Sequence, residues 1–362
     1  MSKEKEIRDT MVDSAMGTEI AGDVVTSEEY VTSEEYASNF ETASNEDLSF
    51  DMTATEVGSD PYAKPLNTST GVREALAAIP IPESSVPDDT PDDGRTPIIH
   101  LENVKVVFKT RTGSLLHPNK IVALKNSTIK LMPGETIGLV GESGCGKSTT
   151  ANVMCGLQPV TEGKVYFNGK DVTKRTAEDR KVIGRVLSVV FQDPATALNA
   201  RMTIQDQLLD PLNVHNIGTK AERKKRVLEL LEMVGLPQSC LQALPGQMSG
   251  GQRQRVAIAR ALSLGPDAII ADEPTSALDV SVRAQILNLL TDLKRDLNLA
   301  MVFISHDIQT IRYISDRIIV MNKGVIVERG TTDQVFYHPK DEYTKLLLGA
   351  APSLLHPDLG ES

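Results

Sequence analysis

The sequence has few cysteines and no long apolar run. Its three cysteines, Cys145, Cys155 and Cys240, show neither CxxC spacing nor a histidine and cysteine cluster. The pattern therefore predicts no disulfide framework and no zinc site, and a reducing compartment fits it best. No stretch approaches the roughly 20 uninterrupted apolar residues that a membrane-spanning helix needs. The chain starts in polar sequence, without the apolar segment of a secretory signal. We expect a soluble, cytosolic protein that needs a partner for any membrane work.

Charge is divided unevenly along the chain. Residues 1–95 hold 22 Asp and Glu residues against 6 Lys and Arg residues, a net charge of −16. The remainder holds 27 acidic and 32 basic residues, a net charge of +5. Two physically different parts therefore share this polypeptide.

The acidic part, residues 1–95, is rich in Ser, Thr, Asp and Glu and contains the hexapeptide VTSEEY twice in tandem. With few aromatic residues and much like charge, it has little apolar surface to offset the entropy of ordering. We predict a disordered acidic extension. It is either a solvated tail or a regulatory or docking arm, phosphorylated on Ser27, Ser33 or nearby threonines.

From Ile98 onward the chain changes to short apolar runs separated by turns and helices. Residues 98–101 and 104–108 predict a first strand region, and residues 127–131 alternate like a partly exposed strand. Residues 136–140 form a nearly continuous apolar run, as expected for a strand buried on both faces. This run leads directly into Gly141.

Residues 141–148, GESGCGKS, match the phosphate-binding loop pattern G-x-x-x-x-G-K-[ST], and a helix is predicted over residues 147–157. Glycines let backbone N–H groups curve around phosphate oxygens, and the helix presents its positive end there. The predicted nucleotide-binding residues are Gly141, Ser143, Gly144, Cys145, Gly146, Lys147, Ser148 and Thr149. Lys147 is expected on the β- and γ-phosphates of ATP and the Ser148 hydroxyl on Mg²⁺, whereas Cys145 is interpreted as a small loop residue.

Two further apolar runs end in polar residues. Residues 268–273 predict a buried strand that ends in Asp272, placed to hold Mg²⁺ through water, and Glu273, the candidate base that polarises the attacking water. The alternative for Glu273 is a solvated loop position. Residues 300–305 deliver His306 to the same sheet edge, where it is better placed to sense the γ-phosphate than an ordinary structural histidine.

The segment Met248-Ser249-Gly250-Gly251-Gln252 resembles the LSGGQ signature of ABC ATPases, with Met in place of Leu. The order of P-loop, Gln192, signature, Asp272-Glu273, residues 276–279 and His306 is similar to a complete ABC ATPase domain. The resemblance covers roughly residues 97–350. It implies an α/β fold with a RecA-like P-loop core over residues 96–350, a helical subdomain at about 195–260 and a short tail at 351–362.

This resemblance also implies a site shared between two chains, because the signature of one ABC subunit caps the nucleotide on the P-loop of its partner. The residues expected to bind ATP in this way are Ser249, Gly250, Gly251, Gln252 and Asp279. Phe108 stands where the family places an aromatic residue on adenine, with core packing as the alternative. Gln192 is expected at a hinge that links Mg²⁺ and water to the membrane partner.

A narrower resemblance lies in Phe191-Gln192-Asp193-Pro194 and the following LNARMT, similar to oligopeptide and dipeptide importers and their nickel and glutathione relatives. Ala200 departs from the usual proline. Residues 338–339 and 343–347 are similar to the end of that group's ATPase domain, although Asp341-Glu342 replaces a His-Pro pair. The cysteine-bearing tail of many relatives is not found here, so an iron–sulfur site is not supported.

The resemblance implies an ATPase subunit that powers import of oligopeptides or dipeptides from the cytoplasmic face of the cell membrane, as a peripheral protein. The implied partners are two transmembrane permeases, a second, non-identical ABC ATPase and an extracellular substrate-binding protein, with no nucleic acid. The same machinery importing nickel, glutathione or another small solute is the alternative. A soluble ABC protein of translation or DNA repair is the alternative from a different class.

Overall fold

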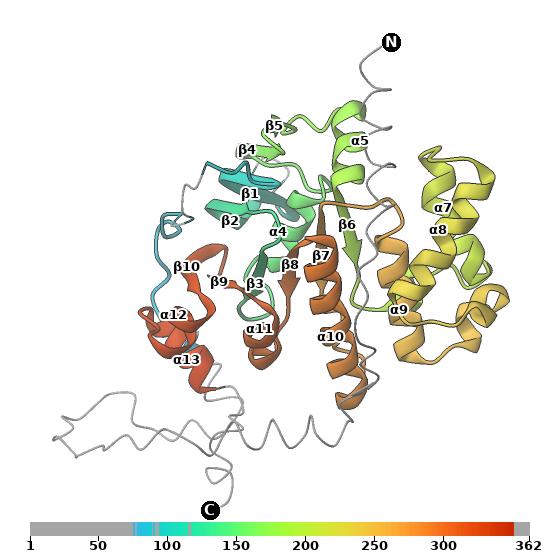
Figure 1. Ribbon diagram of the computed structural model, residues 1–362. Helices are drawn as coiled ribbons and strands as arrows, with labels where there is room; N and C mark the ends of the chain where they lie inside the picture. The colour runs from blue at the N-terminus through green and yellow to red at the C-terminus, as the bar shows by residue number, and fades with distance from the viewer. Residues whose placement is uncertain (1–74, 77, 89, 91–93, 115–116, 351–362) are drawn as a thin grey trace, which may run out of the picture. The chain divides into compact units, whose positions relative to one another are not determined.

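Two β-sheets and the helices around them build the part of the chain that the computed structural model describes, residues 75–76, 78–88, 90, 94–114 and 117–350 (Figure 1). The predicted disorder of residues 1–74, the modification of Ser27 and Ser33, and the predicted tail at 351–362 lie outside these residues. Within them, no helix is both long and apolar enough to cross a bilayer.

The larger sheet has the strand order β10-β9-β3-β8-β7-β6. All its neighbouring pairs are parallel except β9 with β10, which is antiparallel. Its strands are β3 (Thr136–Val140), β6 (Leu187–Val190), β7 (Ala268–Asp272), β8 (Ala300–Ile304), β9 (Arg317–Asn322) and β10 (Val325–Thr331). The strands expected at 136–140, 268–273 and 300–305 are thereby confirmed, although β7 ends at Asp272 and β8 at Ile304, one residue earlier than expected.

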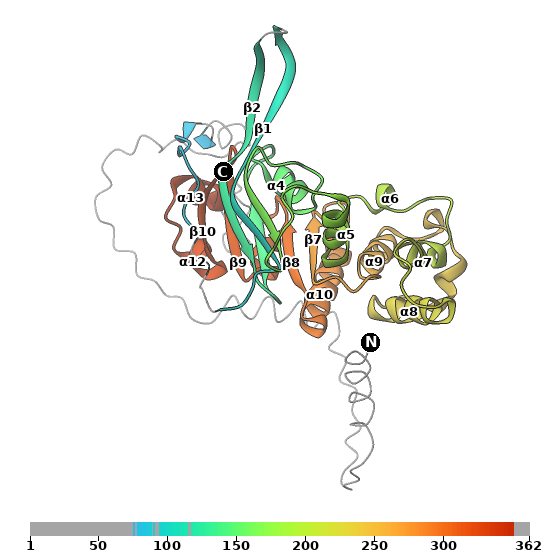
Figure 2. The same ribbon diagram turned by 90° about the horizontal axis from the view of Figure 1, so that it is seen from above.

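The smaller sheet is antiparallel, in the order β2-β1-β4-β5. It consists of β1 (Ile99–Ser114), β2 (His117–Leu131), β4 (Glu162–Phe167) and β5 (Lys170–Asp171). The two apolar runs predicted at 98–101 and 104–108 are one strand with a register shift between Leu101 and Val104, where Asn103 takes a left-handed φ of 50°. Such a bulge interrupts the alternation without ending the strand. The β1–β2 ribbon extends away from the sheets in Figure 2.

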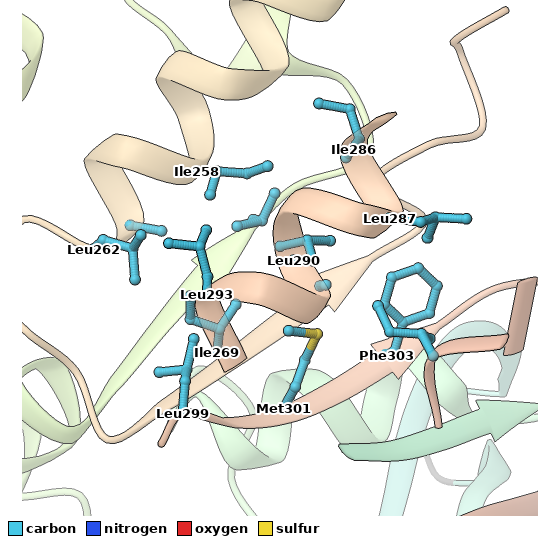
Figure 3. Packing of buried hydrophobic residues seen from close by; sticks show 14 of the residues in the cluster. Ile258, Leu262, Ile269, Ile286, Leu287, Leu290, Leu293, Leu299, Met301 and Phe303 are labelled. Carbon is cyan, nitrogen blue, oxygen red and sulfur yellow. The ribbon is translucent and has the colours of Figure 1, made fainter. Parts of the chain in front are cut away.

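Both faces of the larger sheet are buried, which explains its nearly continuous apolar strands. In β7, Ile269 and Ala271 join one hydrophobic cluster while Ala268 and Ile270 join the other. The first cluster includes Ile286, Leu290 and Leu293 of α10 (Val280–Leu297) together with α9 (Gly250–Ala261), as Figure 3 shows. The second joins the sheet to α4 (Lys147–Met154) and to the smaller sheet.

A group of helices between β6 and β7 lies to one side of the sheets in both views (Figures 1 and 2). Capping boxes define the starts of α8 at Thr219 and α9 at Ser249. In each box the N-cap side chain accepts from a backbone N–H three residues on, and the side chain of that residue accepts from the N-cap N–H. The group consists of α6 (Pro194–Ala197), α7 (Ile204–Val214), α8 (Lys220–Met233), the 3-10 turns Gln238–Gln242 and Pro245–Gln247, and α9. It occupies the stretch where the helical subdomain is expected.

The remaining helices connect the strands and close the chain. They are α5 (Ala177–Val186), α11 (Ile308–Ile314), α12 (Thr332–Tyr337) and α13 (Glu342–Gly349). The helix predicted over 147–157 is shorter, because α4 ends at Met154 and Gly156 has a φ of +66°. A residue in the left-handed region terminates a helix.

Ser85, Val86 and Asp88 hydrogen-bond to strands of the two sheets, although the predicted extension ran to residue 95. The Val86 N–H donates to the Ile326 carbonyl of β10 at 2.8 Å, and the Ser85 hydroxyl donates to the Lys125 carbonyl of β2 at 2.8 Å. Asp88 pairs with Arg329 at 3.0 Å and with Lys130 at 3.2 Å. Expected disorder is therefore wrong for Ser85, Val86 and Asp88. The charge of Asp88 meets basic partners on the sheets, a complementarity that composition alone does not reveal.

Candidate functional site

Four neighbouring strands end at one edge of the larger sheet and bring the predicted catalytic groups together. Strands β3, β8, β7 and β6 are adjacent and parallel, so their carboxyl ends share that edge. The residues that follow these strands begin at Gly141 after β3, Ser305 after β8, Glu273 after β7 and Phe191 after β6. Crevices at the carboxyl ends of strands in open α/β sheets are the usual binding places of this architecture.

The loop after β3 depends on glycine in two ways. Gly141, Gly144 and Gly146 have φ values of 146°, 82° and 116°, a region that other residues rarely adopt. A Cβ at Gly141 would lie 2.2 Å from the Met321 carbonyl oxygen and 2.7 Å from Cys145 Sγ. The P-loop therefore packs against Met321 of β9, and no space is left for a side chain at Gly141.

Lys147 begins α4 and folds back over this loop. Its Nζ donates to the carbonyl oxygens of Gly141 at 2.6 Å and Glu142 at 3.1 Å. Lys147 is buried, yet it is one of the residues that line the cleft described below. A buried cation on two carbonyl oxygens can be transferred to a more basic ligand, such as a phosphate oxygen.

Cys145 lies beneath the loop, buried, and not in the lining of the cleft. Burial raises the pKa of its thiol, and the nearby Lys147 lowers it only in part. The thiol therefore stays protonated at neutral pH, which agrees with the interpretation of a small packing residue.

A cleft of about 300 Å³ opens between the P-loop and the ends of β7 and β8. A void of this size accepts a small polar ligand. Its lining consists of Ala123, Ser143, Gly144, Gly146, Lys147, Ser148, Thr149, Asp272, Glu273, Ile304 and His306. The P-loop, the two carboxylates and the histidine predicted from sequence therefore face one space.

Asp272 ends β7 with its carboxylate partly buried. Burial raises the pKa of this carboxyl, the charge of Glu273 raises it further, and Lys147 acts in the opposite direction. A desolvated carboxylate beside a second one is destabilised in its charged form unless a cation lies nearby. The site therefore favours positive charge between Asp272 and the P-loop.

Glu273 has a backbone conformation that fixes where its side chain points. Its φ is 47°, in the left-handed region, which costs of order 1 kcal/mol or more for a residue with a Cβ. Its N–H donates to the Ile304 carbonyl at 2.9 Å, and its carbonyl accepts from the Ser276 N–H and hydroxyl at 3.2 and 3.1 Å. Both backbone groups are thereby anchored, one to β8 and one to the following turn.

Both carboxylate oxygens of Glu273 have partners from neighbouring strands. The Gln192 side-chain amide donates to Oε2 at 3.0 Å, and His306 Nδ1 lies 3.2 Å from Oε1. The Glu273 side chain is 21% exposed, whereas that of His306 is 67% exposed. The structure thus joins the three residues predicted as catalytic into one contact group, of which Glu273 and His306 line the cleft and Gln192 does not.

The signature segment lies elsewhere in this chain. Ser249 is exposed at the start of α9, where its hydroxyl oxygen accepts from the Gln252 N–H at 3.2 Å and Gln252 Oε1 accepts from the Ser249 N–H at 3.0 Å. None of the described residues that line the cleft belongs to residues 248–252. The chain therefore carries two separate phosphate-binding candidates.

Asp279 and Phe108 are also outside the lining of the cleft. Asp279 is exposed at the residue that precedes α10, and its side chain makes no capping hydrogen bond there. Phe108 is on β1, is 39% exposed and pairs with Ile121 of β2. Their predicted contacts with nucleotide remain predictions.

Three contributors to the site were not predicted from sequence. Ala123 of β2 and Ile304 of β8 line the cleft as apolar wall residues, and such residues carry no chemical signal in a sequence. Tyr343 of α13 accepts a hydrogen bond from the P-loop N–H of Glu142 at 3.0 Å. The partners are 201 positions apart in the sequence, so no local pattern indicates this contact.

Comparison with known proteins agrees with this geometry. The ABC transporter family matches residues 124–276, from the middle of β2 to the turn after Glu273. The dipeptide transport ATP-binding protein DppF of Haemophilus influenzae is 41% identical over 259 residues, 72% of this chain and 79% of that protein. The oligopeptide transport ATP-binding protein OppF of Bacillus subtilis is 44% identical over 263 residues, 72% of this chain and 84% of that protein.

A solved structure of the ATP-binding cassette MJ0796, a dimer in a post-hydrolysis state bound to ADP and phosphate, has the same fold. It superposes with a TM-score of 0.58 at 34% identity, covering 65% of this chain and 98% of that one. The predicted fold class, an α/β P-loop core with an ABC helical subdomain, is confirmed for the described residues. The chain therefore belongs to the ABC transporter family, as an ATP-binding cassette that hydrolyses ATP.

Proposed function

We propose that this chain is the ATPase subunit that powers a membrane importer of oligopeptides or dipeptides. Relatives that are named as oligopeptide and dipeptide transport ATP-binding proteins support the transport part, since this chain matches 79–84% of their length. The observation that carries the ATPase part is the convergence of Lys147, Asp272 and Glu273 on one cleft.

Phosphate binding is assigned to the P-loop and the start of α4. The γ-phosphate of ATP would draw Lys147 Nζ from the Gly141 and Glu142 carbonyls, because a charged phosphate oxygen is the stronger acceptor. The helix start adds oriented N–H groups. The loop residues proposed to contact the phosphates are Gly141, Ser143, Gly144, Cys145, Gly146, Ser148 and Thr149.

The donor groups at this edge suit Mg²⁺, which prefers oxygen ligands and keeps several waters. Ser148 supplies a hydroxyl and Asp272 a carboxylate, and both line the cleft. Burial and the charge of Glu273 raise the pKa of Asp272. A bound cation would offset both effects, so this raised pKa fits a carboxylate that serves as a cation ligand. We assign Ser148, Asp272 and Gln192 to Mg²⁺, which when bound would neutralise charge on the phosphates.

Hydrolysis is assigned to Glu273 with Gln192 and His306. A carboxylate oxygen accepts more than one hydrogen bond, so Glu273 can hold a water while Gln192 and His306 keep its side chain oriented. Glu273 would polarise that water for attack on the γ-phosphate. His306, exposed at the cleft, would contact the γ-phosphate and report its presence.

The signature is proposed to act on the nucleotide of a second ATPase subunit. Ser249 is exposed at the N-terminus of α9, where helix N–H groups favour an anion, yet it is not in the lining of this chain's own cleft. Head-to-tail pairing of two non-identical subunits would place Ser249, Gly250, Gly251, Gln252 and Asp279 at the partner's ATP. Phe108 is proposed to stack on adenine.

Transport then requires subunits outside this chain. We propose two transmembrane permeases, which hold this subunit peripherally at the cytoplasmic face, and an extracellular substrate-binding protein, without nucleic acid. Gln192 would transmit the state of the site to the permeases, since it follows β6 and contacts Glu273 directly. ATP binding would close the ATPase pair and hydrolysis would reopen it.

Purification of the native complex from membranes and its reconstitution in vesicles tests this proposal. We expect permeases and a second ATPase to copurify, and ATP-driven uptake of labelled di- and oligopeptides. A complex that carries Glu273→Gln is the matched control and should assemble without uptake. Uptake of nickel or glutathione in place of peptides would overturn the substrate, and copurification with ribosomes or DNA repair proteins would overturn transport.

A further inference from the structure

The P-loop is held from its rear by a tyrosine near the end of the described chain. Tyr343, on the first turn of α13, is completely buried, and its phenol oxygen accepts a hydrogen bond from the N–H of Glu142 at 3.0 Å. Burial raises the pKa of Tyr343 well above that of free tyrosine. The group is therefore a neutral acceptor throughout the physiological pH range.

The same peptide unit is held on its other side by Lys147. The peptide between Gly141 and Glu142 presents its N–H to Tyr343 and its carbonyl oxygen to Lys147 Nζ, at 3.0 and 2.6 Å. Gly141, with a φ of 146°, has no side chain that would restrict rotation of this unit. Tyr343 therefore supplies an orientation that the backbone itself does not enforce.

Tyr343 is in turn located by hydrogen bonds that start in β10. The buried side chain of Glu328 accepts from the N–H groups of Lys340 at 2.7 Å and Asp341 at 3.1 Å. Asp341 then caps α13 by accepting from the Tyr343 N–H at 2.9 Å. The start of α13 is thereby fixed to the sheet, so the phenol oxygen has a defined position opposite the P-loop.

We propose that Tyr343 is a positioning residue for ATP binding, which fixes the Gly141–Glu142 peptide and thereby the site from which Lys147 reaches the phosphates. The proposal rests on the assignment of the P-loop as the ATP site. Without the phenol oxygen, the peptide can rotate and Lys147 loses a fixed carbonyl partner. Nucleotide binding must then order the loop, and the entropy cost of this ordering lowers the affinity for ATP.

The test is Tyr343→Phe in the full-length chain, which keeps the ring and removes one oxygen atom. We expect the dissociation constant of a fluorescent ATP analogue and the KM for ATP to rise about fivefold to tenfold, as for loss of one buried hydrogen bond. The kcat at saturating ATP should stay within about twofold, because bound phosphates restore the loop order.

Two control variants separate positioning from packing. Thr344→Val alters the next residue of α13, whose buried hydroxyl has no hydrogen-bond partner in the structure, and Tyr166→Phe removes a phenol oxygen that donates to Glu102 on the smaller sheet. Both should leave the KM for ATP unchanged. An unchanged KM in Tyr343→Phe, even with a lowered melting temperature, would overturn the proposal, as would an equal rise in Thr344→Val.

Lys147→Ala distinguishes this inference from the proposed site itself. We expect it to lose binding of the fluorescent analogue. If Lys147→Ala binds normally, the assigned ATP site is wrong. If Lys147→Ala fails to bind while Tyr343→Phe behaves as wild type, only the role of Tyr343 is wrong.

Discussion

The imidazole of His306 contacts the carboxylate of Glu273, with 3.2 Å between Nδ1 and Oε1. The two residues follow neighbouring parallel strands, β8 and β7, and the Glu273 N–H is bonded to the last residue of β8. The sheet register therefore sets their relative position. Because the two side chains are in contact, a substitution at one also changes the surroundings of the other. We therefore expect the effects of the two substitutions on hydrolysis to be non-additive.

Glu273→Gln should abolish most hydrolysis and preserve ATP binding. The amide is nearly the same size and keeps one oxygen, but it cannot act as a base, and such groups contribute about 10²–10⁴-fold to rate. Phosphate release and binding of a fluorescent ATP analogue measure the two effects. Glu232→Gln, the same change at an exposed position of α8, is the control. Hydrolysis at the wild-type rate in Glu273→Gln would refute its assigned role.

His306→Ala should slow hydrolysis without unfolding the protein. The side chain is 67% exposed, so the free energy of unfolding should change by no more than about 0.5 kcal/mol. Because His306 orients Glu273 and faces the cleft, single-turnover hydrolysis is expected to fall about 10-fold to 100-fold. If His306→Ala is less stable but hydrolyses ATP at the wild-type rate, the role of His306 is structural.

Gly141→Ala should both destabilise the protein and impair ATP binding. The new Cβ would lie 2.2 Å from a backbone carbonyl oxygen, and the φ of 146° is unfavourable for alanine. We expect a loss of about 3 kcal/mol in the free energy of unfolding, from strain and steric overlap. The control is Gly246→Ala, since its Cβ would meet nothing within 4 Å. Similar melting temperatures for both variants would contradict the argument.

The sequence was sufficient for the fold class and for the strands that carry the site. The apolar runs predicted at 136–140, 268–273 and 300–305 contain β3, β7 and β8, and in each of these strands residues on both faces join a hydrophobic cluster. Polar residues directly after such strands must emerge at one edge if the strands are parallel neighbours. That rule brings Asp272, Glu273 and His306 to the P-loop in the structure, while their roles stay predictions.

The contacts that sequence could not predict are long-range or depend on charge pairing. Tyr343 accepts a hydrogen bond from Glu142 although the two residues are 201 positions apart, and the family resemblance at residues 343–347 does not indicate this contact. Residues 85–90 have the composition of a solvated tail, yet Asp88 finds Arg329 and Lys130 on the sheet. Composition indicates only how much free energy a segment can gain on average when it becomes ordered. A few specific ion pairs, such as those of Asp88, can stabilise the ordered state nevertheless.

Truncation should locate the true start of the folded domain. Deletion of residues 1–74 keeps all described contacts of residues 76–90, whereas deletion of residues 1–90 removes buried Leu76 and the hydrogen bonds of Ser85, Val86 and Asp88. We expect the shorter deletion to melt as wild type and the longer one several degrees lower, about 4 °C or more. Equal melting temperatures would return the boundary to residue 95.

Asp88→Asn should destabilise the protein at neutral pH and progressively less in acid. The Asp88 side chain is 10% exposed and its Arg329 partner 4% exposed. Burial alone would raise the pKa of Asp88, but the Thr90 hydroxyl, Lys130 and Arg329 together hold it below its ordinary value of 3.8. Loss of this charged hydrogen bond should lower the free energy of unfolding by about 2 kcal/mol near pH 7. The loss is no larger because Arg329 still donates to the carbonyls of Val86 and Thr128.

The sign of the pH dependence follows from the lowered pKa. The folded state binds the Asp88 proton less tightly than the unfolded state does, so the stabilisation is complete above about pH 5 and is lost as the pH falls through 3.8 and below. Urea unfolding of wild type and Asp88→Asn should therefore converge toward acid pH. Asp296→Asn, which breaks an exposed ion pair with Arg295, is the control and should change stability little. A constant difference between wild type and Asp88→Asn from pH 7 to pH 3 would show that the charge of Asp88 does not hold this segment.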